Sequence, residues 1–554
     1  MILLERGMFV KRNPLRHNAG FFMIPEQKRP SWFKSRGYLH LTPKINVYKR
    51  AEEIFSKVRN KKFVARHAFF PLIHSVIKER KFKKHPDEPG KRVHSYHDKK
   101  KDVHVKTAKN RPLHYATHID SMIFGYYGEI LLELYEKKLA EHEGLSECII
   151  AYRKILDPSN TKETGKSTIH FANEAFNEIK NRSEDECVVL MFDIKSFFSE
   201  IDHQLLKKAW CDLLKTERLE KDHFNVFNAA TNFSYILLND LRISKNKNGR
   251  RNGFDEKKLA YIRRTTGKEA FFESEKDFRD AIKYKEITVF KHPFIKNNRP
   301  VGIPQGLPIS AMLANLYLLD FDIKILDIIV KDQNCYYRRY SDDILIICKA
   351  ENYQQIERLV LELIEESKLE ISTNKTEVFL FKNMQISPKI NRLTSIQILK
   401  DKKGNESVCR IGEKPLTYLG FEFHGYKTQI KSANQAKFYR RMIYAVKRRA
   451  KRVLSRANSN IEQSGGIFKG QIKRLYTHCN LDKTKFFTTR KYLARNVMGE
   501  FSYRIKRDKL NHKSNYFSYT RRAAEILKEP RITDVVVKKY KTIFHQALNR
   551  HFKK

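Results

Sequence analysis

Residues 336–349 read YYRRYSDDILIICK, so two adjacent carboxylates, Asp342 and Asp343, lie between an aromatic run and an apolar run. Both runs favour β-structure, and the pattern predicts a hairpin whose turn holds the two acids at one edge of a sheet. Neighbouring Asp side chains repel each other unless a cation or hydrogen-bond donors compensate. For such a pair taken alone, an exposed and solvated turn is the simplest interpretation, so the rest of the chain has to decide.

A second strand that ends in a carboxylate is predicted upstream, because residues 187–193 form an apolar run that closes with Asp193. If this strand lies beside the hairpin, the carboxylates of Asp193, Asp342 and Asp343 converge. Such a cluster can hold two Mg²⁺ ions roughly 3.5–4 Å apart, which activates a 3′-hydroxyl and stabilises a leaving pyrophosphate. Hard oxygen ligands without His or Cys beside them favour Mg²⁺, or Mn²⁺, over zinc. General acid–base hydrolysis by paired carboxylates is the competing chemistry, but it does not account for the charge of the chain.

The charge is the outlier of the composition: 110 Lys and Arg face 63 Asp and Glu in 554 residues, a formal net charge of +47. This excess favours a polyphosphate partner, since each neutralised phosphate releases counterions. An anionic membrane is the alternative partner, but no long apolar span and no lipidation motif is present, so no membrane association is expected. The seven cysteines are scattered without a Cys-x-x-Cys pair. Together with a charged, non-signal-like start of the chain, they predict reduced thiols and a cytoplasmic protein.

The chain divides by pattern into three expected regions. Residues 1–110 form a basic N-terminal extension, and residues 240–297 form a basic insertion in the region that follows. Helical periodicity starts at His118, a short strand is expected at Ala151–Lys154, and a glycine hinge is expected at residues 464–466. From about residue 430 the chain becomes helical and very basic, with an apolar stripe at Phe438, Met442, Val446, Ala450 and Val453. The Gly165-Lys166-Ser167 run lacks the first glycine of a phosphate loop, so an ATPase-type loop is rejected.

Five segments, in chain order, resemble the successive palm motifs of reverse transcriptases: Asp193–Phe198, Pro304–Gly306, Tyr340–Asp343, Asn374–Thr376 and Leu419–Phe421. The resemblance implies an α+β right-hand polymerase with fingers and palm at 111–425, the palm being an antiparallel sheet packed on helices. A helical, basic thumb and nucleic-acid-binding region would then occupy 426–554. The segment from Arg111 to Tyr135 and the basic end are most similar to bacterial defence-associated reverse transcriptases of the abortive-infection and unclassified groups.

The resemblance also implies roles for individual acids. Asp193 and Asp342 would bridge the metal ions, and the Ile194 carbonyl would be an additional ligand. Asp343 would complete the acidic cluster. Lys375 matches the lysine that protonates the leaving pyrophosphate, although a surface lysine is the plainer interpretation.

Other positions would contact the nucleotide. Phe198 matches the steric gate, whose ring collides with a ribose 2′-hydroxyl, so deoxynucleotides are expected; an ordinary core aromatic is the alternative. Gln305 and Gly306 match the turn that lies against the nascent base pair, where glycine permits close backbone approach. Arg153 resembles the fingers residue that clamps the triphosphate. Tyr340, which opens the Tyr-Ser-Asp-Asp motif, is expected among the nucleotide-binding residues.

The resulting prediction is an RNA-directed DNA polymerase that uses dNTPs, binds RNA as template or as a non-coding scaffold, and makes a DNA product. The family resemblance implies a role in antiphage defence, and an oligomer is compatible with the sequence. Two alternatives stay open: a template-independent or RNA-synthesising polymerase on the same palm, and a non-catalytic RNA-binding scaffold, for which the charge alone would suffice.

Overall fold

The computed structural model describes residues 30–34, 36–43, 45–47, 49–79, 83–88, 90–98, 102–158, 165–244, 251–400, 406–408, 414–457, 487–495, 501–509 and 515–552. The expected hinge at 464–466, much of the basic N-terminal extension and the side chain of Val453 lie outside this description. The described chain forms two compact units, one of residues 1–138 with 198–317 and the other of residues 139–197 with 318–554. Each unit is described by itself, and the expected domain boundaries after residues 110 and 425 stay predictions.

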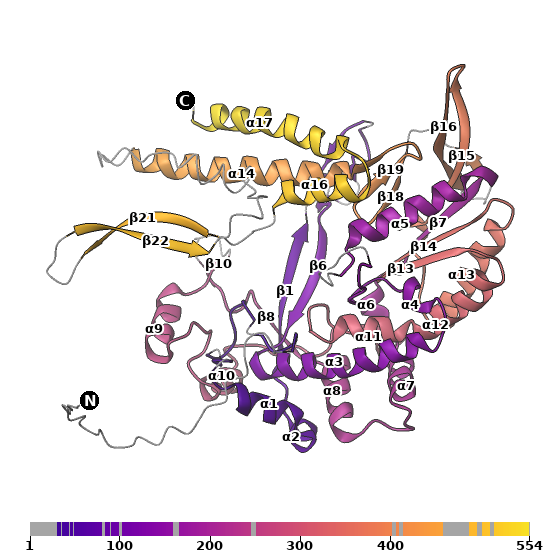
Figure 1. Ribbon diagram of the computed structural model, residues 1–554. Coiled ribbons are helices and arrows are strands. Elements are labelled where there is room, and N and C mark those ends of the chain that lie inside the picture. Colours follow the sequence, from indigo (N-terminus) through magenta and orange to yellow (C-terminus); the bar gives the residue numbers. More distant parts are fainter. Residues whose placement is uncertain are drawn as a thin grey trace, which may run out of the picture. The chain divides into compact units, whose positions relative to one another are not determined.

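The first unit is built on a three-stranded sheet in the order β6-β1-β8 (Figure 1). Strand β1 (Leu72–Glu79) pairs antiparallel with β6 (Lys109–Tyr115) and parallel with β8 (Tyr235–Leu237). Shorter strands of this unit form separate two-stranded sheets: β2 (Lys83–Lys84) with β3 (Arg92–Val93), β4 (Ser95–Asp98) with β5 (Val103–Lys106), β9 (Ile243–Ser244) with β10 (Arg251–Gly253), and β11 (Ile295–Lys296) with β12 (Arg299–Pro300).

The helices of this unit are α1 (Ala51–Arg59), α2 (Lys61–Arg66), α3 (His118–Ala140) as far as Lys138, α6 (Phe197–Glu200) from Phe198 on, α7 (His203–Leu214), α8 (Lys221–Thr231), α9 (Glu256–Thr266), α10 (Glu275–Lys283) and α11 (Ser310–Tyr317). Their ends follow local sequence signals. Asp202 caps α7 by accepting from the backbone of Gln204 and Leu205, and Ser274 forms a capping box with Asp277 at α10. The basic insertion at 240–297 therefore contains two capped helices, α9 and α10.

The second unit contains the predicted palm sheet, six antiparallel strands in the order β13-β14-β7-β15-β16-β17. The strands are β7 (Cys187–Asp193), β13 (Tyr336–Tyr340), β14 (Asp343–Lys349), β15 (Glu377–Ser387), β16 (Ile390–Lys400) and β17 (Glu406–Val408). Both sequence predictions at its centre, the strand over 187–193 and the hairpin around Ser341, are confirmed. Strand β7 is central, and its side chains are buried on both faces, which is why its sequence is almost continuously apolar.

Helices cover both faces of this sheet. Helix α5 (Thr168–Asn181) packs its apolar face, including Phe176, on Val189, Leu345 and Phe379, and α13 (Tyr353–Glu366) packs on the other face of β7. The short elements of this unit are α4 (Leu145–Cys148), α12 (Leu319–Ile325), the π-helical turn Leu326–Lys331, and the 3₁₀ turns Ser183–Asp185 and Thr373–Lys375. The expected strand at Ala151–Lys154 is wrong, because these residues form bends without a ladder partner.

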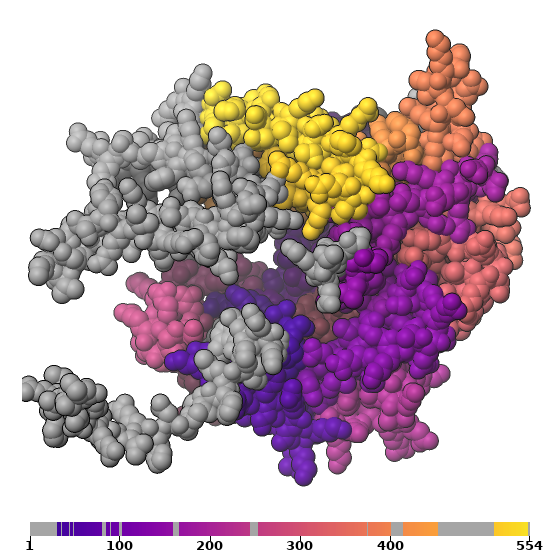
Figure 2. Space-filling view, in the orientation of Figure 1, coloured from indigo at the N-terminus to yellow at the C-terminus, as the bar shows by residue number. Residues whose placement is uncertain are grey.

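The C-terminal part of the second unit adds a small sheet and long basic helices. Strands β18 (Leu416–Tyr418), β19 (Phe421–Phe423) and β20 (Thr428–Ile430) lead into α14 (Ser432–Ala457), followed by the hairpin β21 (Phe487–Arg495) and β22 (Phe501–Lys509), then α16 (Tyr516–Ile526) and α17 (Arg531–Phe552). The predicted apolar stripe of α14 is confirmed at Met442 and Val446, which pack against Phe544 and Leu548 of α17. Figure 2 shows α16 and α17 as one continuous yellow surface, and it shows the β15–β16 hairpin projecting from the rest of this unit. Within the described ranges, every helix is too short or too polar to span a membrane.

Candidate active site

The register of the palm sheet brings two of the predicted acids together. Asp343, the first residue of β14, lies directly opposite Asp193, the last residue of β7, and the Ile194 N–H donates to the Asp342 carbonyl at 3.0 Å. Side chains directly opposite each other on antiparallel strands share one face, with Cβ atoms about 4.5–5.5 Å apart. Tyr340 lies opposite Asp343 on the other side, so Tyr340, Asp343 and Asp193 form a row on one face of the sheet. Asp342 adjoins this row in the turn between β13 and β14.

The turn that carries Asp342 is tight and conformationally strained. Tyr340 pairs with Asp343, so the loop consists of only Ser341 and Asp342, and Ser341 has a φ of 61°. A positive φ at the first central residue alone is the pattern of a type II′ turn, which prefers glycine at that place. A side chain there costs on the order of 1–3 kcal/mol, and such strain persists only when surrounding contacts hold it.

One of the contacts that hold this turn comes from a buried ion pair between Arg339 and Asp322, on the opposite face of the sheet. Arg339 is completely buried, and its Nε donates to Oδ1 of Asp322, which α12 carries, at 2.7 Å. The Tyr337 hydroxyl donates to the same carboxylate at 2.6 Å. The Arg339 Nη1 also donates to the Ser341 carbonyl at 3.3 Å, so this guanidinium links the sheet, α12 and the turn. The Tyr152 hydroxyl donates to the Ser341 Oγ at 3.1 Å and holds the turn from a third direction.

Sequence reasoning did not identify this support. In the sequence, Arg339 stands only within the run 336–349, Ser341 within the Tyr340–Asp343 motif and Tyr152 within the expected strand Ala151–Lys154. The sequence pattern predicts no supporting role for any of them or for Asp322. A usable signal was present, because Asp322 is a charged residue inside the apolar helical run 310–329, and a buried acid requires a cationic partner. Only the fold shows which arginine that partner is.

The ionised carboxylates of Asp193, Asp342 and Asp343 repel one another. Burial, the Asp342 carboxylate and the Asp193 carboxylate, in that order, raise the pKa of Asp343 from its ordinary value to about 6. Lys375 and Lys431 oppose this rise. Lys431, at the start of α14, was not predicted to belong to the site. A partly buried carboxylate with two anionic neighbours gains from any cation that comes close.

Lys375 forms an ion pair with one of the three acids. It ends the 3₁₀ turn Thr373–Lys375, and its Nζ forms an ion pair with Oδ1 of Asp193. This turn is fixed to β7 because the Ser372 N–H donates to the Asp193 carbonyl at 2.8 Å. Lys375 and Asp193 therefore lie side by side, although the predicted proton transfer to pyrophosphate is not tested by this contact.

Three predicted nucleotide contacts belong to the first unit. The Gln305 carbonyl accepts from the His114 N–H at 2.7 Å, and the Phe198 carbonyl accepts from the Ile303 N–H at 2.7 Å. Gly306 has a φ of 117°, and a Cβ there would lie 2.5 Å from the His114 carbonyl oxygen. Glycine is thus required at 306 because the turn packs against β6, which is a structural reason independent of any nucleotide.

Comparison with known proteins identifies this region. Residues 268–423 match the family model described as "Reverse transcriptase (RNA-dependent DNA polymerase)". The resemblance to this family therefore covers a central segment of the chain, under half of its length. The match includes the segments Pro304–Gly306, Tyr340–Asp343 and Asn374–Thr376, and it begins after Asp193 and Phe198. Strands β13 to β17 of the sheet lie within the matched residues, whereas β7, which pairs Asp193 with Asp343, precedes them.

Among solved structures, the chain is similar to apo telomerase from Candida tropicalis truncated from its C-terminal domain, with a TM-score of 0.33, 10% identity, and 58% of this chain and 53% of that chain covered. It is also similar to telomerase from Candida albicans in complex with a fragment of telomeric RNA, with a TM-score of 0.33, 12% identity, and 69% and 49% coverage. The chain thus spans about half the length of these proteins. No curated protein matched the chain.

The oxygen atoms at this edge of the sheet are suitable ligands for a divalent cation. Asp193, Asp342 and Asp343 offer carboxylate oxygens, and the Ile194 carbonyl at the end of β7 is a further oxygen beside them. Carboxylate and carbonyl oxygens are the ligands that Mg²⁺ prefers. In the part of the chain that the structure describes, however, no three acidic, His or Cys side chains are already grouped to hold a metal, and Asp193 is paired with Lys375. The residues fit the ion by chemistry, and their side chains would have to turn toward it.

The guanidinium of Arg153 donates hydrogen bonds to the end of α4. Its Nη1 donates to the carbonyls of Ser146 and Ile149, both at 2.7 Å, and its Nη2 donates to the Ser146 Oγ at 2.8 Å. These bonds close the end of the short helix α4. The predicted triphosphate contact of Arg153 stays a prediction, and it would require the guanidinium to leave these acceptors.

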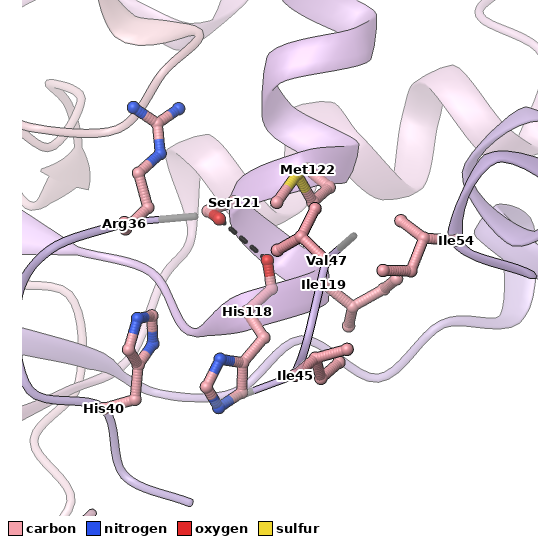
Figure 3. Close-up of a pocket in the computed structure, with 9 residues that line it drawn as sticks. All are labelled: Arg36, His40, Ile45, Val47, Ile54, His118, Ile119, Ser121 and Met122. Atoms are coloured by element: carbon pink, nitrogen blue, oxygen red, sulfur yellow. Dashed lines mark hydrogen bonds between the residues drawn. The ribbon is translucent and has the colours of Figure 1, made fainter. Parts of the chain in front are cut away.

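A small cavity in the first unit is unrelated to the acids. Arg36, His40, His118, Met122 and their apolar neighbours enclose about 10 Å³ beside the start of α3, where the Ser121 Oγ donates to the His118 carbonyl (Figure 3). That volume holds a single water at most. It is a packing gap under the N-terminal segment rather than a substrate site.

Proposed function

We propose that the chain is an RNA-directed DNA polymerase that adds deoxynucleotides to a primer 3′ end. The observation that carries this proposal is the direct pairing of Asp193 with Asp343, beside Asp342. Asp342 and Asp343 lie within the residues that match the reverse transcriptase family model. Three carboxylates at the end of adjacent strands are costly to keep ionised together. Their position is explained if cations and a nucleotide triphosphate occupy that edge of the sheet.

The proposed metal ligands are Asp193, Asp342, Asp343 and the Ile194 carbonyl. When bound there, two Mg²⁺ ions, or Mn²⁺, would lower the pKa of the primer hydroxyl and stabilise the charge of the leaving pyrophosphate. In this proposal Lys375 leaves Asp193 for the triphosphate and protonates the leaving group. Its exposure supports that movement, because 52% of the Lys375 side chain is accessible to solvent.

The proposed substrate is a dNTP on an RNA template. Phe198 would exclude the 2′-hydroxyl, Gln305 and Gly306 would lie against the new base pair, and Tyr340 and Arg153 would contact the nucleotide. In keeping with this, the Phe198 ring is only partly buried, so it is accessible to a ligand. Tyr340 lies in the same row as Asp343 and Asp193.

The proposed organisation has fingers and palm at 111–425, with the insertion 240–297, and a nucleic-acid-binding thumb at 426–554. The charge of +47 supports an RNA partner and a DNA product along the surface. We further propose a cytoplasmic protein that acts in antiphage defence with a non-coding RNA. These two statements rest on the cysteine pattern and on the family resemblance, and an oligomer is compatible with them.

The test is primer extension on an RNA template with purified protein, dNTPs and Mg²⁺. Asp342→Asn and Asp193→Asn should abolish incorporation, whereas Asp332→Asn, an exposed acid of the same unit, should leave it unchanged. Circular dichroism and thermal unfolding check that the variants fold. Incorporation by either active-site variant at the wild-type rate would remove these acids from the mechanism.

Three further outcomes would change the proposed function. Preference for rNTPs over dNTPs would identify an RNA-synthesising enzyme on the same palm. Extension without template would identify a terminal transferase. Tight, salt-sensitive RNA binding with no product in Mg²⁺ or Mn²⁺ would identify a non-catalytic scaffold.

A further inference from the structure

The insertion at 240–297 encloses a cavity that none of the proposed polymerase residues line. Its volume is about 240 Å³, and it lies between the β9–β10 hairpin, the start of α9 and the segment after α10. The aromatic rings of Phe254, Phe271 and Phe272 form much of its wall. Phe271 and Phe272 belong to the core of the first unit, so this wall is fixed in place.

Arg242 and Lys258 form cation–π contacts with rings of this wall. The guanidinium carbon of Arg242 lies 5.0 Å from the centre of the Phe254 ring, and the Lys258 Nζ lies 5.0 Å from the centre of the Phe272 ring. The Arg242 Nε is buried, and no described residue accepts its hydrogen. A buried guanidinium N–H without an acceptor is unfavourable, so a ligand that supplies an acceptor in the cavity would be stabilised.

The remaining polar groups of the cavity are acidic. Asp240, Asp255 and Glu286 line it together with the two cations, so negative charges outnumber positive ones. Asp255 already uses its Oδ1 to accept from the backbone of α9 at 3.0 Å, and its second oxygen faces no such N–H. An excess of carboxylates disfavours a phosphate inside the cavity. It favours a neutral ring that brings N–H donors.

The size of the cavity and the residues beside it also favour a single neutral ring as the ligand. A cavity of about 240 Å³ is smaller than the roughly 300–1,000 Å³ that drug-sized ligands occupy, so it suits one ring system and not a whole nucleotide. Two exposed tyrosines flank the cavity residues: Tyr261, at 53% exposure and three residues after Lys258 on α9, and Tyr284, at 68% and two residues before Glu286. Residues three apart on a helix share a face. Exposed aromatic rings among lysines and arginines are the usual platform for single strands, whose bases stack on them.

We propose that the insertion 240–297 binds single-stranded nucleic acid and takes one unpaired nucleobase into the cavity between Phe254 and Phe272. Guanine is the best match. Its O6 and N7 would accept from Arg242, and its amino group and ring N–H would donate to the carboxylates. The strand would continue over Tyr261 and Tyr284, with its phosphates outside the cavity. This contact goes beyond nucleotide transfer and does not depend on it.

A binding experiment on the full-length protein tests the proposal. The probe is a fluorescein-labelled 12-nucleotide oligouridine with one central guanosine, compared with the same strand carrying an abasic residue there. Loss of base stacking weakens binding roughly tenfold or more, so the abasic strand should bind that much more weakly to the wild type. Phe254→Leu, which keeps an apolar side chain, should remove most of the difference between the two strands. Equal affinity of the wild type for both strands would overturn the proposal.

Two adjacent lysines provide a charge-matched control. Lys257 and Lys258 are both exposed at the start of α9, but only Lys258 lines the cavity. Lys258→Gln should reduce the preference for guanosine over the abasic strand, and Lys257→Gln should leave that preference unchanged, although both remove one charge. Identical effects of the two substitutions would mean that charge alone acts here and would contradict a base pocket.

Crosslinking locates the base and separates this inference from the polymerase proposal. With 6-thioguanosine at the central position, irradiation should join the strand to a peptide that contains Phe254 or Phe272, in the wild type and equally in Asp342→Asn. Crosslinks confined to other peptides would refute the pocket even if the protein polymerises. A protein that crosslinks at Phe254 but synthesises nothing would refute the polymerase and leave the pocket standing.

Competition identifies the source of the base. RNA and DNA strands with the same guanine should both bind, since the cavity recognises the base edge. Guanosine monophosphate should compete only at concentrations at least tenfold above the strand, because it lacks the contacts with Tyr261 and Tyr284. Competition by the free nucleotide at equal concentration would reassign the cavity to a mononucleotide and overturn the single-strand proposal.

Discussion

Replacing Arg339 by methionine should separate the stability of the palm from the geometry of its catalytic turn. The substitution removes a fully buried guanidinium and leaves the Asp322 carboxylate in the core with only the Tyr337 hydroxyl as partner. Breaking a buried ion pair on one side costs about 3–5 kcal/mol, because an uncompensated charge stays behind. Against a total stability of about 5–15 kcal/mol, this is a large loss.

The double variant Arg339→Met/Asp322→Leu should recover most of that free energy, since no buried charge remains. It should not recover activity. The strained φ of 61° at Ser341 would still lack the hydrogen bond from Arg339 to its carbonyl, so Asp342 and Asp343 would shift. A displacement of about 1 Å can cost on the order of 100-fold in rate.

Urea unfolding measures the free energies, and single-turnover primer extension measures the rate. Lys324→Met is the control, because Lys324 also lies on α12 but forms an exposed ion pair with Glu366, which is worth about 1 kcal/mol or less. A loss below about 1 kcal/mol in Arg339→Met would refute the argument from burial. Full polymerase activity in the stable double variant would show that Arg339 does not position the turn.

Three other predictions concern single residues. The pKa of Asp343 in the folded protein, about 6, lies above the value in the unfolded chain. Protonated Asp343 is therefore favoured by folding, and the free energy of unfolding falls as the pH rises through 6 and the Asp343 carboxyl ionises. With metals chelated by EDTA, Asp343→Asn should therefore raise the free energy of unfolding at pH 7.5, by up to about 3 kcal/mol, and leave it unchanged near pH 3, as urea titrations would show. Gly306→Ala should lower the melting temperature, because the new Cβ would clash with the His114 carbonyl oxygen and the alanine would have a positive φ, at a cost of about 1–3 kcal/mol. Gly37→Ala should leave the melting temperature unchanged, because a Cβ at residue 37 would have no atom within 4 Å. Phe198→Ala should raise rNTP over dNTP incorporation roughly tenfold or more in competition assays, and an unchanged ratio would exclude a steric gate.

Local pattern was enough to predict the elements that position the acids. The apolar run ending at Asp193 is long enough and β-prone enough to be a central strand, and the β-prone runs on either side of the acids predict a hairpin. The sequence predicts that the turn holds both acids, whereas the structure has only Ser341 and Asp342 in the loop and Asp343 at the start of β14. The order of the five motif segments then predicted that both strands belong to one palm. Short irregular segments were less predictable: Ala151–Lys154 forms bends, because its few residues carry no period that distinguishes a strand.

What only the tertiary structure decided is how charges are paired. The sequence of this protein determines that three carboxylates end two strands, because alternation and apolar runs act locally along the chain. It does not determine that Arg339 belongs to Asp322, that Lys375 lies on Asp193, or that Arg153 is bound to the end of α4. With 110 Lys and Arg in the chain, every acid has many possible partners, and the choice among them depends on distances that exist only after packing. The raised pKa of Asp343 has the same origin, since burial and neighbouring charge are properties of the folded sheet.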